Sequence, residues 1–464
     1  MLQLFTCHAR FSLALCLGLA VVVATPPLQE TGLVAGTSVA MADDDDGGDD
    51  DGGSRGSGGY GSRSGGDRDM IRRVNPSFRW PWQRAKREPA RRAPVRRQAE
   101  LPSRAPNEIV AIGLDEASIA SLEQEGYVVD SRTGIALTGS EMVRLIVPRG
   151  VTLDAARQAV AARSASAAVD FNHYYQPQSL VSPPCADCRL MRDMVGWPAA
   201  GEERAGTCPA LPRIGLVDTA INADHAAFAD GRLEVLRLDD AERPKSGEQH
   251  GTAVAALLVG GAGSRVPGLL PASELVAVDA FQRFRKTADI ANVFDLVRAL
   301  DLLLARDVRV VNLSLSGPPN LLLEKAVQAA IEKDAILVAA AGNKGPNAKP
   351  VYPAAYPGVI AVTAVDSARK PYRRAVRGEH IDIAAPGVGV WTAASVSGVR
   401  QKSGTSFAAP FVTAAAAVLL AARPELTLPE LEAELANSAE DIGTPGKDAI
   451  YGWGLLNVRT LCSR

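Results

Sequence analysis

From about residue 210 onward, short runs that are apolar at every position alternate with longer runs whose apolar residues have helical spacing. A strand that is apolar throughout must be covered on both faces, and strands alternating with helices are typical of a parallel sheet. The pattern therefore predicts an α/β fold for residues 210–464. The expected strands are RIGLVD, LVAVDAF, VRVVNLSL, AILVAAAG and VIAVTAV, and the expected helices are DIANVFDLVRALDLLLAR and LLLEKAVQAAIEKD.

Polar residues stand at the ends of two of these strands. In an open parallel sheet, ligands bind beside the carboxyl ends of the strands. Asp218 ends the first strand, and Gly342-Asn343 ends the strand AILVAAAG. A buried aspartate costs free energy unless its carboxylate is hydrogen-bonded. Both residues are also common in ordinary turns, which is the plainer interpretation.

Two further polar residues stand where helices are expected to begin. His250, followed by Gly and Thr, opens the small-residue helix AVAALLVG. Ser406 lies in SGTSFAAP and starts the helix FAAPFVTAAAAVLL, with Pro410 expected in the first turn, where a missing N–H costs little. Ser406 is therefore either a helix cap or a nucleophile.

An aspartate, a histidine and a serine at element ends of one α/β domain suit nucleophilic catalysis. A serine hydroxyl needs an adjacent base to take its proton, and the base needs an acid to fix its tautomer. The amide of Asn343 could stabilise an oxyanion together with the backbone N–H of Ser406. Each signal is weak by itself, but the four residues together form a candidate site.

Five segments make a family resemblance visible. VDTAINADH, QHGTAVAALLVG, NLSLSGP, AAAGNKGP and SGTSFAAPFVTAAA stand in the order and context of subtilisin-like serine proteases, whose chain order is Asp, His, Ser. The resemblance covers about residues 210–460. It implies that Asp218 orients the base, His250 is the general base, Ser406 is the nucleophile and Asn343 donates to the oxyanion.

Two positions depart from the family pattern, and two histidines need separate interpretation. Ala220 stands where glycine is usual, and alanine would be strained there if φ were positive. Ala226 follows His225, where proline is frequent. Neither change removes a catalytic group. His225 is a rival base without the Gly-Thr helix start, and His380 is expected to be structural.

The resemblance also implies where a substrate lies. An extended peptide would pair with strand 314–316, and the pocket for the residue before the scissile bond would lie between that strand and 340–342. Val351 stands where relatives with a deep, aromatic-accepting pocket commonly have glycine, so we expect Ala, Val or Leu to be preferred over Phe or Tyr. The pocket shows no acid, so Lys and Arg should be poor. The expected substrate-binding residues are Ser314, Leu315, Ser316, Ala340, Ala341, Gly342 and Val351.

Residues 106–178 are predicted to form a smaller α+β unit. The strand EIVAIGL, a helix ending at Gly126, the strand YVVD, a turn around Thr133-Gly134, the strand EMVRLIVP, a helix capped by Thr152 and the strand AAVDFNHYY give the order βαββαβ. This order resembles the propeptides that chaperone and inhibit subtilisin-like proteases. His173, the only histidine of this unit, is expected to pack rather than to catalyse.

The N-terminus predicts export. Arg10 precedes the apolar run FSLALCLGLAVVVA, which is shorter than the ~20 residues that a membrane-spanning helix needs and has the length of a signal-peptide core. We expect residues 1–42 to be a signal peptide, although its cleavage point is open. The protein is then secreted or periplasmic. The alternative is an uncleaved membrane anchor, the one case in which membrane contact is expected.

Residues 43–105 are expected to be a disordered linker. The stretch 43–68 consists mainly of Asp and Gly and cannot form a core. The stretch 71–98 is rich in Arg, Trp and Pro and could bind an anionic surface or nucleic acid. Its prolines prevent a regular basic helix, and its positive charge can be balanced by the negative charge of the stretch 43–68. No nucleic-acid partner is therefore expected.

Four cysteines follow the apolar run: Cys185, Cys188, Cys208 and Cys462. They allow three pairings, between which the sequence cannot choose. Cys185-x-x-Cys188 could be half of a zinc site, but no second such pair exists, so disulfides are favoured. The first three lie in the expected connecting segment, 179–209. No metal or cofactor is expected. Calcium is conceivable, without a visible cluster of carboxylates.

Three functions remain open at this stage. The favoured one is an exported serine endopeptidase made as a zymogen, with protein or peptide substrates and its own domain 106–178 as a partner. The second is a catalytically weak or silent binding protein on the same scaffold, acting through its charged N-terminal segments. The third is a serine esterase or acyl transferase, but the nucleophile elbow G-x-S-x-G is absent because Ala408 replaces the second glycine.

Overall fold

The computed structural model describes residues 101–177, 180–181, 190–198, 213–229, 232–238, 244–285, 288–459 and 461. The chain divides into the units Met1–Pro94 and Val95–Arg464, and all described residues belong to the second. The predicted signal peptide, most of the predicted linker and every cysteine lie outside the described residues.

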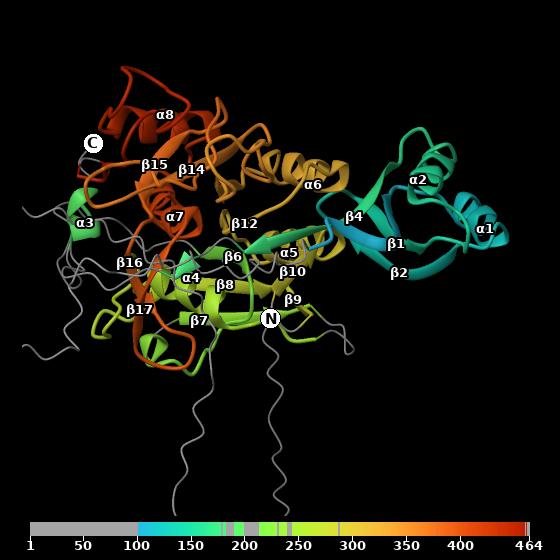
Figure 1. Ribbon diagram of the computed structural model, residues 1–464, viewed down its shortest axis with the longest axis horizontal. Helices are drawn as coiled ribbons and strands as arrows, with labels where there is room; N and C mark the ends of the chain where they lie inside the picture. Colours follow the sequence, from blue (N-terminus) through green and yellow to red (C-terminus); the bar gives the residue numbers. More distant parts are fainter. Residues whose placement is uncertain are drawn as a thin grey trace, which may run out of the picture. The chain divides into compact units, whose positions relative to one another are not determined.

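The larger part of the described chain is built on a seven-stranded sheet with the order β15-β14-β13-β11-β6-β8-β7 (Figure 1). Neighbouring strands in it are parallel throughout. The α/β fold expected from the apolar strands is therefore confirmed. The strands are β6 (Ile214–Asp218), β7 (Arg232–Arg237), β8 (Glu274–Asp279), β11 (Val310–Leu313), β13 (Ile336–Ala340), β14 (Val359–Val365) and β15 (Ile383–Pro386).

Helices cover both faces of this sheet. Successive residues of β8 enter different cores: Leu275 packs with α4 (Gln249–Val259) and α7 (Thr405–Ala422), whereas Val276 packs with α5 (Val293–Leu304) and α6 (Leu321–Ile331). This double burial explains why the inner strands are mainly apolar. Asn312 in β11 is an exception, and the edge strand β7 carries the polar residues Arg232, Glu234 and Arg237. The helix α8 (Leu428–Ser438) also packs on the first core.

The helix α7 is long and apolar enough to cross a membrane by composition alone. Its apolar window is 94% buried inside the fold, so it serves as the central core helix. The shorter elements of this part are α3 (Leu190–Met194), the 3₁₀ turn η1 (Ala226–Phe228), β9 (Gln282–Phe284), β10 (Ala288–Asn292), β12 (Leu315–Ser316), β16 (Val390–Ala393) and β17 (Val399–Ser403).

The smaller α+β unit has the predicted order βαββαβ and its own hydrophobic core. Its antiparallel sheet runs β2-β3-β1-β4, and Thr152 caps the second helix by accepting from the N–H of Ala155 at 3.3 Å. Its elements are β1 (Arg104–Ile112), α1 (Glu116–Gln124), β2 (Val128–Ile135), β3 (Ser140–Ile146), α2 (Leu153–Ala161) and β4 (Ala168–Pro177).

Two local predictions were wrong. Thr133 and Gly134 lie inside β2, and the turn follows at 136–139, where Gly139 has a φ of +63°. The predicted helix 289–306 begins only at Val293, because Asn292 caps it by accepting from the N–H of Asp295 at 3.0 Å. The residues before that cap form β10 instead.

The strand β4 continues beyond its own sheet. It pairs with β10 on one side, where Ala291 lies opposite Tyr175, and with β12 on the other, where Leu315 lies opposite Pro177. A short strand, β5 (Leu180–Val181), follows and joins a separate sheet with the order β16-β17-β5.

Candidate active site

Asp218 and His250 meet where β6 ends and α4 begins. Both side chains are buried, and the Nδ1 of His250 lies 2.6 Å from the Oδ1 of Asp218. The same oxygen accepts from the N–H of Thr219 at 2.7 Å. Because the carboxylate oxygen accepts in this contact, the proton is assigned to Nδ1, which leaves Nε2 as the acceptor of the ring. This tautomer is the one that a general base requires.

Gly251 allows the close approach of α4 to β6. A Cβ at this position would lie 2.3 Å from the carbonyl oxygen of Thr219 and 2.7 Å from that of Ala220, both of them backbone atoms. The N–H of Gly251 also donates to the Thr219 hydroxyl at 2.9 Å. Glycine is therefore required after His250 for steric reasons. His225 is not followed by a glycine, and this difference distinguishes the two histidines.

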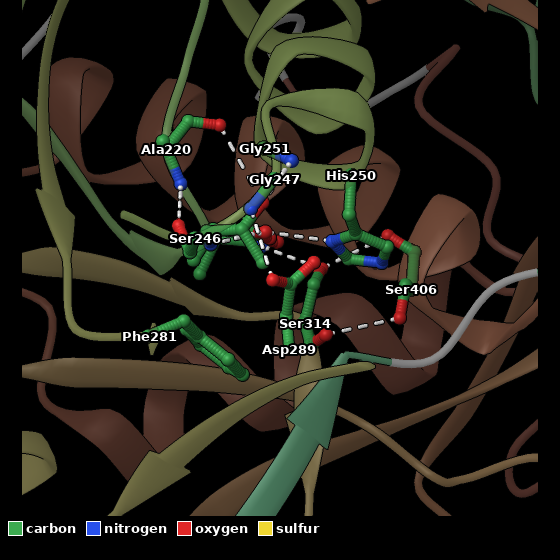
Figure 2. A network of polar contacts seen from close by, with 12 residues as sticks. Ala220, Ser246, Gly247, His250, Gly251, Phe281, Asp289, Ser314 and Ser406 are labelled. Atoms are coloured by element: carbon green, nitrogen blue, oxygen red, sulfur yellow. Dashed lines mark hydrogen bonds and ion pairs between the residues drawn. The ribbon is translucent and has the colours of Figure 1, made fainter. Parts of the chain in front are cut away.

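Ala220 is not strained, although the family usually has glycine there. Among the described residues, the non-glycine residues with positive φ are Arg285, Asp307, Asp334 and Arg369, and Ala220 is not one of them. Its N–H donates to the hydroxyl of Ser246 at 2.7 Å, and that hydroxyl donates to Asp279 at 2.9 Å (Figure 2).

Asp289 supports the segment before His250, a role that sequence analysis missed. Its Oδ1 accepts from the N–H of Gly247 at 2.9 Å and pairs with Arg283 at 3.1 Å. Burial raises the pKa of Asp289. The hydrogen bond from Gly247 and the positive charge of Arg283 act in the opposite direction and lower it. Because Asp289 lies on β10, the residues mistaken for a helix start contribute to the site.

Ser406 is fully buried at the start of α7. Its hydroxyl donates to the carbonyl of Ser314 at 3.1 Å, and the Ser314 hydroxyl donates to the carbonyl of Ser406 at 2.9 Å. The preceding Gly404 has a φ of +151° and a ψ of 159°, a conformation essentially restricted to glycine. The SGTS motif thus contains a backbone turn that only glycine forms without strain.

Pro410 lies in the second turn of α7 and not in the first, as predicted, because the helix already begins at Thr405. Proline has no N–H for the carbonyl four residues earlier, which is that of Ser406. The Ser314 hydroxyl takes the place of this missing donor. Ser314 is in turn held by the side-chain amide of Asn312 at 2.8 Å. Pro410 therefore leaves the carbonyl of Ser406, the candidate nucleophile, free to accept the hydrogen bond from Ser314.

Figure 2 shows Ser406 beside the imidazole ring of His250. The hydroxyl is bonded to Ser314, and within the described residues the Nε2 of His250 has no hydrogen-bond partner. To donate to this nitrogen, the Ser406 hydroxyl would have to give up its bond to Ser314. Such contacts commonly tighten only when substrate is bound. The structure therefore brings the predicted acid, base and nucleophile together, with the last bond unmade.

Asn343 lies beside the start of α7 and is oriented by Thr405. Its Oδ1 accepts from both the N–H and the hydroxyl of Thr405, each at 3.1 Å. The Thr405 hydroxyl also accepts from the N–H of Gly342 at 3.1 Å. These two bonds fix the orientation of the amide, so that its oxygen and not its NH₂ group faces Thr405. Sequence analysis missed this function of Thr405, although a hydroxyl directly before a candidate nucleophile was a signal.

The residues expected to form the substrate strand and the pocket wall lie on or beside β12 and β13. Leu315 and Ser316 form β12, which pairs with β4. Ala340, Ala341 and Gly342 are buried at the end of β13. A Cβ on Gly342 would lie 2.7 Å from the Cγ2 of Val351, so the valine packs against this wall.

The three other histidines that the structure describes lie outside this cluster. His225 caps η1, because its Nδ1 accepts from the N–H of Ala227 at 3.1 Å, and its Nε2 lies 3.1 Å from the carbonyl of Gly398. The Nδ1 of His173 lies 3.0 Å from the amide of Asn320. Burial lowers the pKa of His380. In the part of the chain that the structure describes, no group of three His, Cys, Asp or Glu residues could hold a metal.

Comparison with known proteins places this geometry in a family. A profile of the subtilase family matches residues 212–454. The minor extracellular protease Epr of Bacillus subtilis is 30% identical over 55% of this chain, which spans only 39% of that relative. Subtilisin DY of Bacillus licheniformis is 31% identical over 53% of this chain and 89% of its own length.

Among solved structures, the keratinolytic enzyme fervidolysin from Fervidobacterium pennivorans shares the fold, with a TM-score of 0.66 and 20% identity. The match covers 79% of this chain and 62% of fervidolysin, so it extends to residues before 210. The profile match includes more than half of the 464 residues, and together with the strands, helices and residues described above it shows that this chain belongs to the subtilase family of serine peptidases.

Proposed function

We propose that this protein is an exported serine endopeptidase, made as a zymogen, that hydrolyses peptide bonds through Asp218, His250 and Ser406. The observation that carries the proposal is the buried 2.6 Å contact between Asp218 and His250, with Ser406 beside the ring (Figure 2). Export is supported by the apolar N-terminal run and by the extracellular relative Epr.

The proposed reaction begins with the Ser406 hydroxyl leaving the carbonyl of Ser314 and turning to His250. Nε2 takes the hydroxyl proton while Oγ attacks the carbonyl carbon of the scissile bond. Asp218 stabilises the resulting imidazolium, which then gives its proton to the leaving amine. A water molecule repeats the sequence on the acyl ester, so the products are a carboxylate and an amine, and the enzyme is regenerated.

The negative charge on the attacked oxygen needs donors that are already in place. The NH₂ group of Asn343 and the backbone N–H of Ser406 are the proposed donors. The backbone donor lies in the first turn of α7, where the helix dipole also favours negative charge. Thr405 reduces the reorganisation cost, because it already holds the amide in one orientation.

Replacing Asn343 by alanine is expected to lower kcat about 10²–10³-fold with little change in KM, because the lost donor acts on the transition state. The measurement is steady-state hydrolysis of a peptide substrate by the mature enzyme. Thr405→Ser is the matched control: it keeps the hydroxyl that orients Asn343 and should retain activity. An Asn343→Ala enzyme with unchanged kcat would remove this residue from the mechanism.

The pocket before the scissile bond is proposed to favour Ala, Val or Leu over Phe or Tyr. Val351 packs on Gly342 at the predicted pocket wall, and its β-branched side chain has few alternative rotamers. Pocket contacts of this size discriminate by about 10–200-fold per methylene.

Val351→Gly is therefore expected to raise kcat/KM for peptides with Phe at that position by at least about tenfold relative to peptides with Ala. Cleavage-site profiling of a peptide mixture by mass spectrometry measures this preference. A wild-type enzyme that cuts best after Phe or Tyr, with no gain in the variant, would show that Val351 does not limit the pocket.

The smaller domain is proposed to be an inhibitory propeptide. Its contacts with the peptidase part support this: Asp170 accepts from the N–H of Leu321 at the start of α6 at 3.0 Å, and Asn320 donates to the carbonyl of Phe171 at 3.0 Å. Its last strand pairs with β12, the predicted substrate strand.

The alternative to a serine endopeptidase is a catalytically weak or silent binding protein on the same scaffold. The labelling experiment in the Discussion distinguishes these two functions.

A further inference from the structure

A group of exposed cations lies beside Asn343. Segment 343–350 contains two lysines, and segment 369–377 contains one lysine and four arginines, whereas neither segment contains Asp or Glu. One of the arginines, Arg369, is paired with Glu440. The other six side chains are exposed, and we call them the basic surface: Lys344, Lys349, Lys370, Arg373, Arg374 and Arg377.

Backbone hydrogen bonds hold the two segments together on both sides of Asn343. The N–H of Gly345 donates to the carbonyl of Arg374 at 2.8 Å, and the N–H of Val376 donates to the carbonyl of Gly342 at 3.0 Å. The Nε of Arg374 also donates to the carbonyl of Asn343 at 3.4 Å. The basic surface therefore has a fixed place beside the proposed oxyanion donor.

The segment 369–377 also contributes to the wall of the proposed substrate pocket. A Cβ on Gly342 would lie 2.7 Å from the Cγ2 of Val351 and 3.3 Å from the Cγ2 of Val376, so both valines pack against this glycine. Val376 is fully buried, whereas the next residue, Arg377, is exposed. A peptide that enters this pocket therefore comes close to the basic surface.

The acids near these segments form no ion pair with the basic surface among the described residues. Asp366 accepts from the backbone N–H of Lys370 at 2.9 Å, and Asp382 is paired with Lys447 at 2.9 Å. Glu379 follows segment 369–377 and is exposed. The charge of the six side chains is therefore not balanced by direct partners. Such charge attracts anionic groups, repels cationic ones and can raise the rate of encounter with an oppositely charged substrate about 10–10³-fold.

We propose that the basic surface selects acidic polypeptides as substrates, so that bonds flanked by Asp and Glu are cut faster than bonds flanked by Lys and Arg. This inference rests on the proposed function. The small apolar pocket selects the residue directly before the cut, and the basic surface acts on the residues around it. Nucleic acid carries the same kind of charge, but a polypeptide is the partner that the proposed reaction brings to Asn343.

Two matched peptides test this selection, with enzyme purified after expression and maturation of the full chain. Both peptides have Ala before the scissile bond, and they differ only in the flanking residues, which are glutamates in one and lysines in the other. At low salt, kcat/KM should be at least about tenfold higher for the glutamate peptide. The difference should lie mainly in KM and shrink as salt is added, because salt screens exposed charges beyond about 10 Å at 0.1 M. Equal values, or a preference for the lysine peptide, would overturn the proposal.

A double charge reversal assigns the effect to the basic surface. Arg373→Glu/Arg377→Glu should abolish or reverse the preference for the glutamate peptide, and Arg373→Gln/Arg377→Gln should give an intermediate preference. Arg232→Glu/Arg265→Glu is the matched control. It makes the same change of charge on exposed arginines at the amino end of β7 and in the loop after α4, away from the carboxyl ends of the strands. The control should keep the wild-type preference, and equal losses in both double variants would contradict the assignment.

Labelling with an uncharged active-serine reagent separates this inference from the proposed function. Arg373→Glu/Arg377→Glu should label on Ser406 at about the wild-type rate. A wild-type protein that labels but cuts both peptides equally contradicts the inference alone. A reversal variant that loses binding to a DNA oligonucleotide, but keeps the peptide preference, assigns the surface to nucleic acid and also contradicts it. A folded wild-type protein that neither labels nor cuts contradicts the proposed function as well.

Discussion

Replacing Ser406 with alanine is expected to reduce turnover by about 10⁶-fold, the general magnitude for loss of a subtilisin nucleophile. The variant should also accumulate as unprocessed precursor if the enzyme matures by its own activity. Alanine suits the helix start, and the loss of one hydrogen bond to Ser314 leaves the packing of α7 in place. The measurements are kcat on a peptide substrate and the mass of the expressed protein.

Ser438→Ala is the matched control for this variant. Ser438 ends α8, and its hydroxyl donates to the carbonyl of Leu435 at 3.0 Å, so the same atom and a similar bond are removed. This control should mature and turn over as the wild type does. Normal maturation of Ser406→Ala in a protease-free host would exclude self-processing through this residue.

Replacing His250 with alanine is expected to have a comparable effect, about 10⁶-fold in kcat, because the hydroxyl then has no base. His225→Ala is the matched control, since His225 is also buried and uses both ring nitrogens. That control should lose about 1–3 kcal/mol of folding stability, because the N–H of Ala227 and the carbonyl of Gly398 lose their partner. The folded fraction should keep the turnover of the wild type.

The two histidine variants are compared by kcat at a temperature below both unfolding midpoints. The double variant Ser406→Ala/His250→Ala should be no slower than either single variant, because residues acting as one unit are not additive. Equal losses of kcat in His250→Ala and His225→Ala would show that neither histidine has a specific role.

The sequence predicted the sheet well because burial on both faces leaves an unambiguous pattern. Leu275 and Val276 enter opposite cores, so a polar residue in such a strand must find a hydrogen-bond partner inside the fold, as Asn312 does with Ser314 and Thr413. The positions of Asp218 and His250 were predictable for a similar reason, since both stand at element ends. Their distance was not, because it depends on the approach that Gly251 allows.

The errors came from local signals that tertiary contacts override. The residues of β10 have apolar spacing compatible with a helix, but pairing with β4 and the cap at Asn292 make them a strand. Pro410 was placed one turn too early because periodicity locates helix ends only approximately. The exchange of hydrogen bonds between Ser314 and Ser406 joins residues 92 positions apart, and no local pattern encodes it.

Chemical labelling shows whether Ser406 is a nucleophile that His250 activates. The mature protein is incubated with an aryl phosphonate ester that reacts with active serines, and the adduct is mapped by mass spectrometry. We expect one adduct per molecule, on Ser406, which is absent in Ser406→Ala and forms much more slowly in His250→Ala. A folded wild-type protein that forms no adduct, or forms it on another residue, would contradict this expectation.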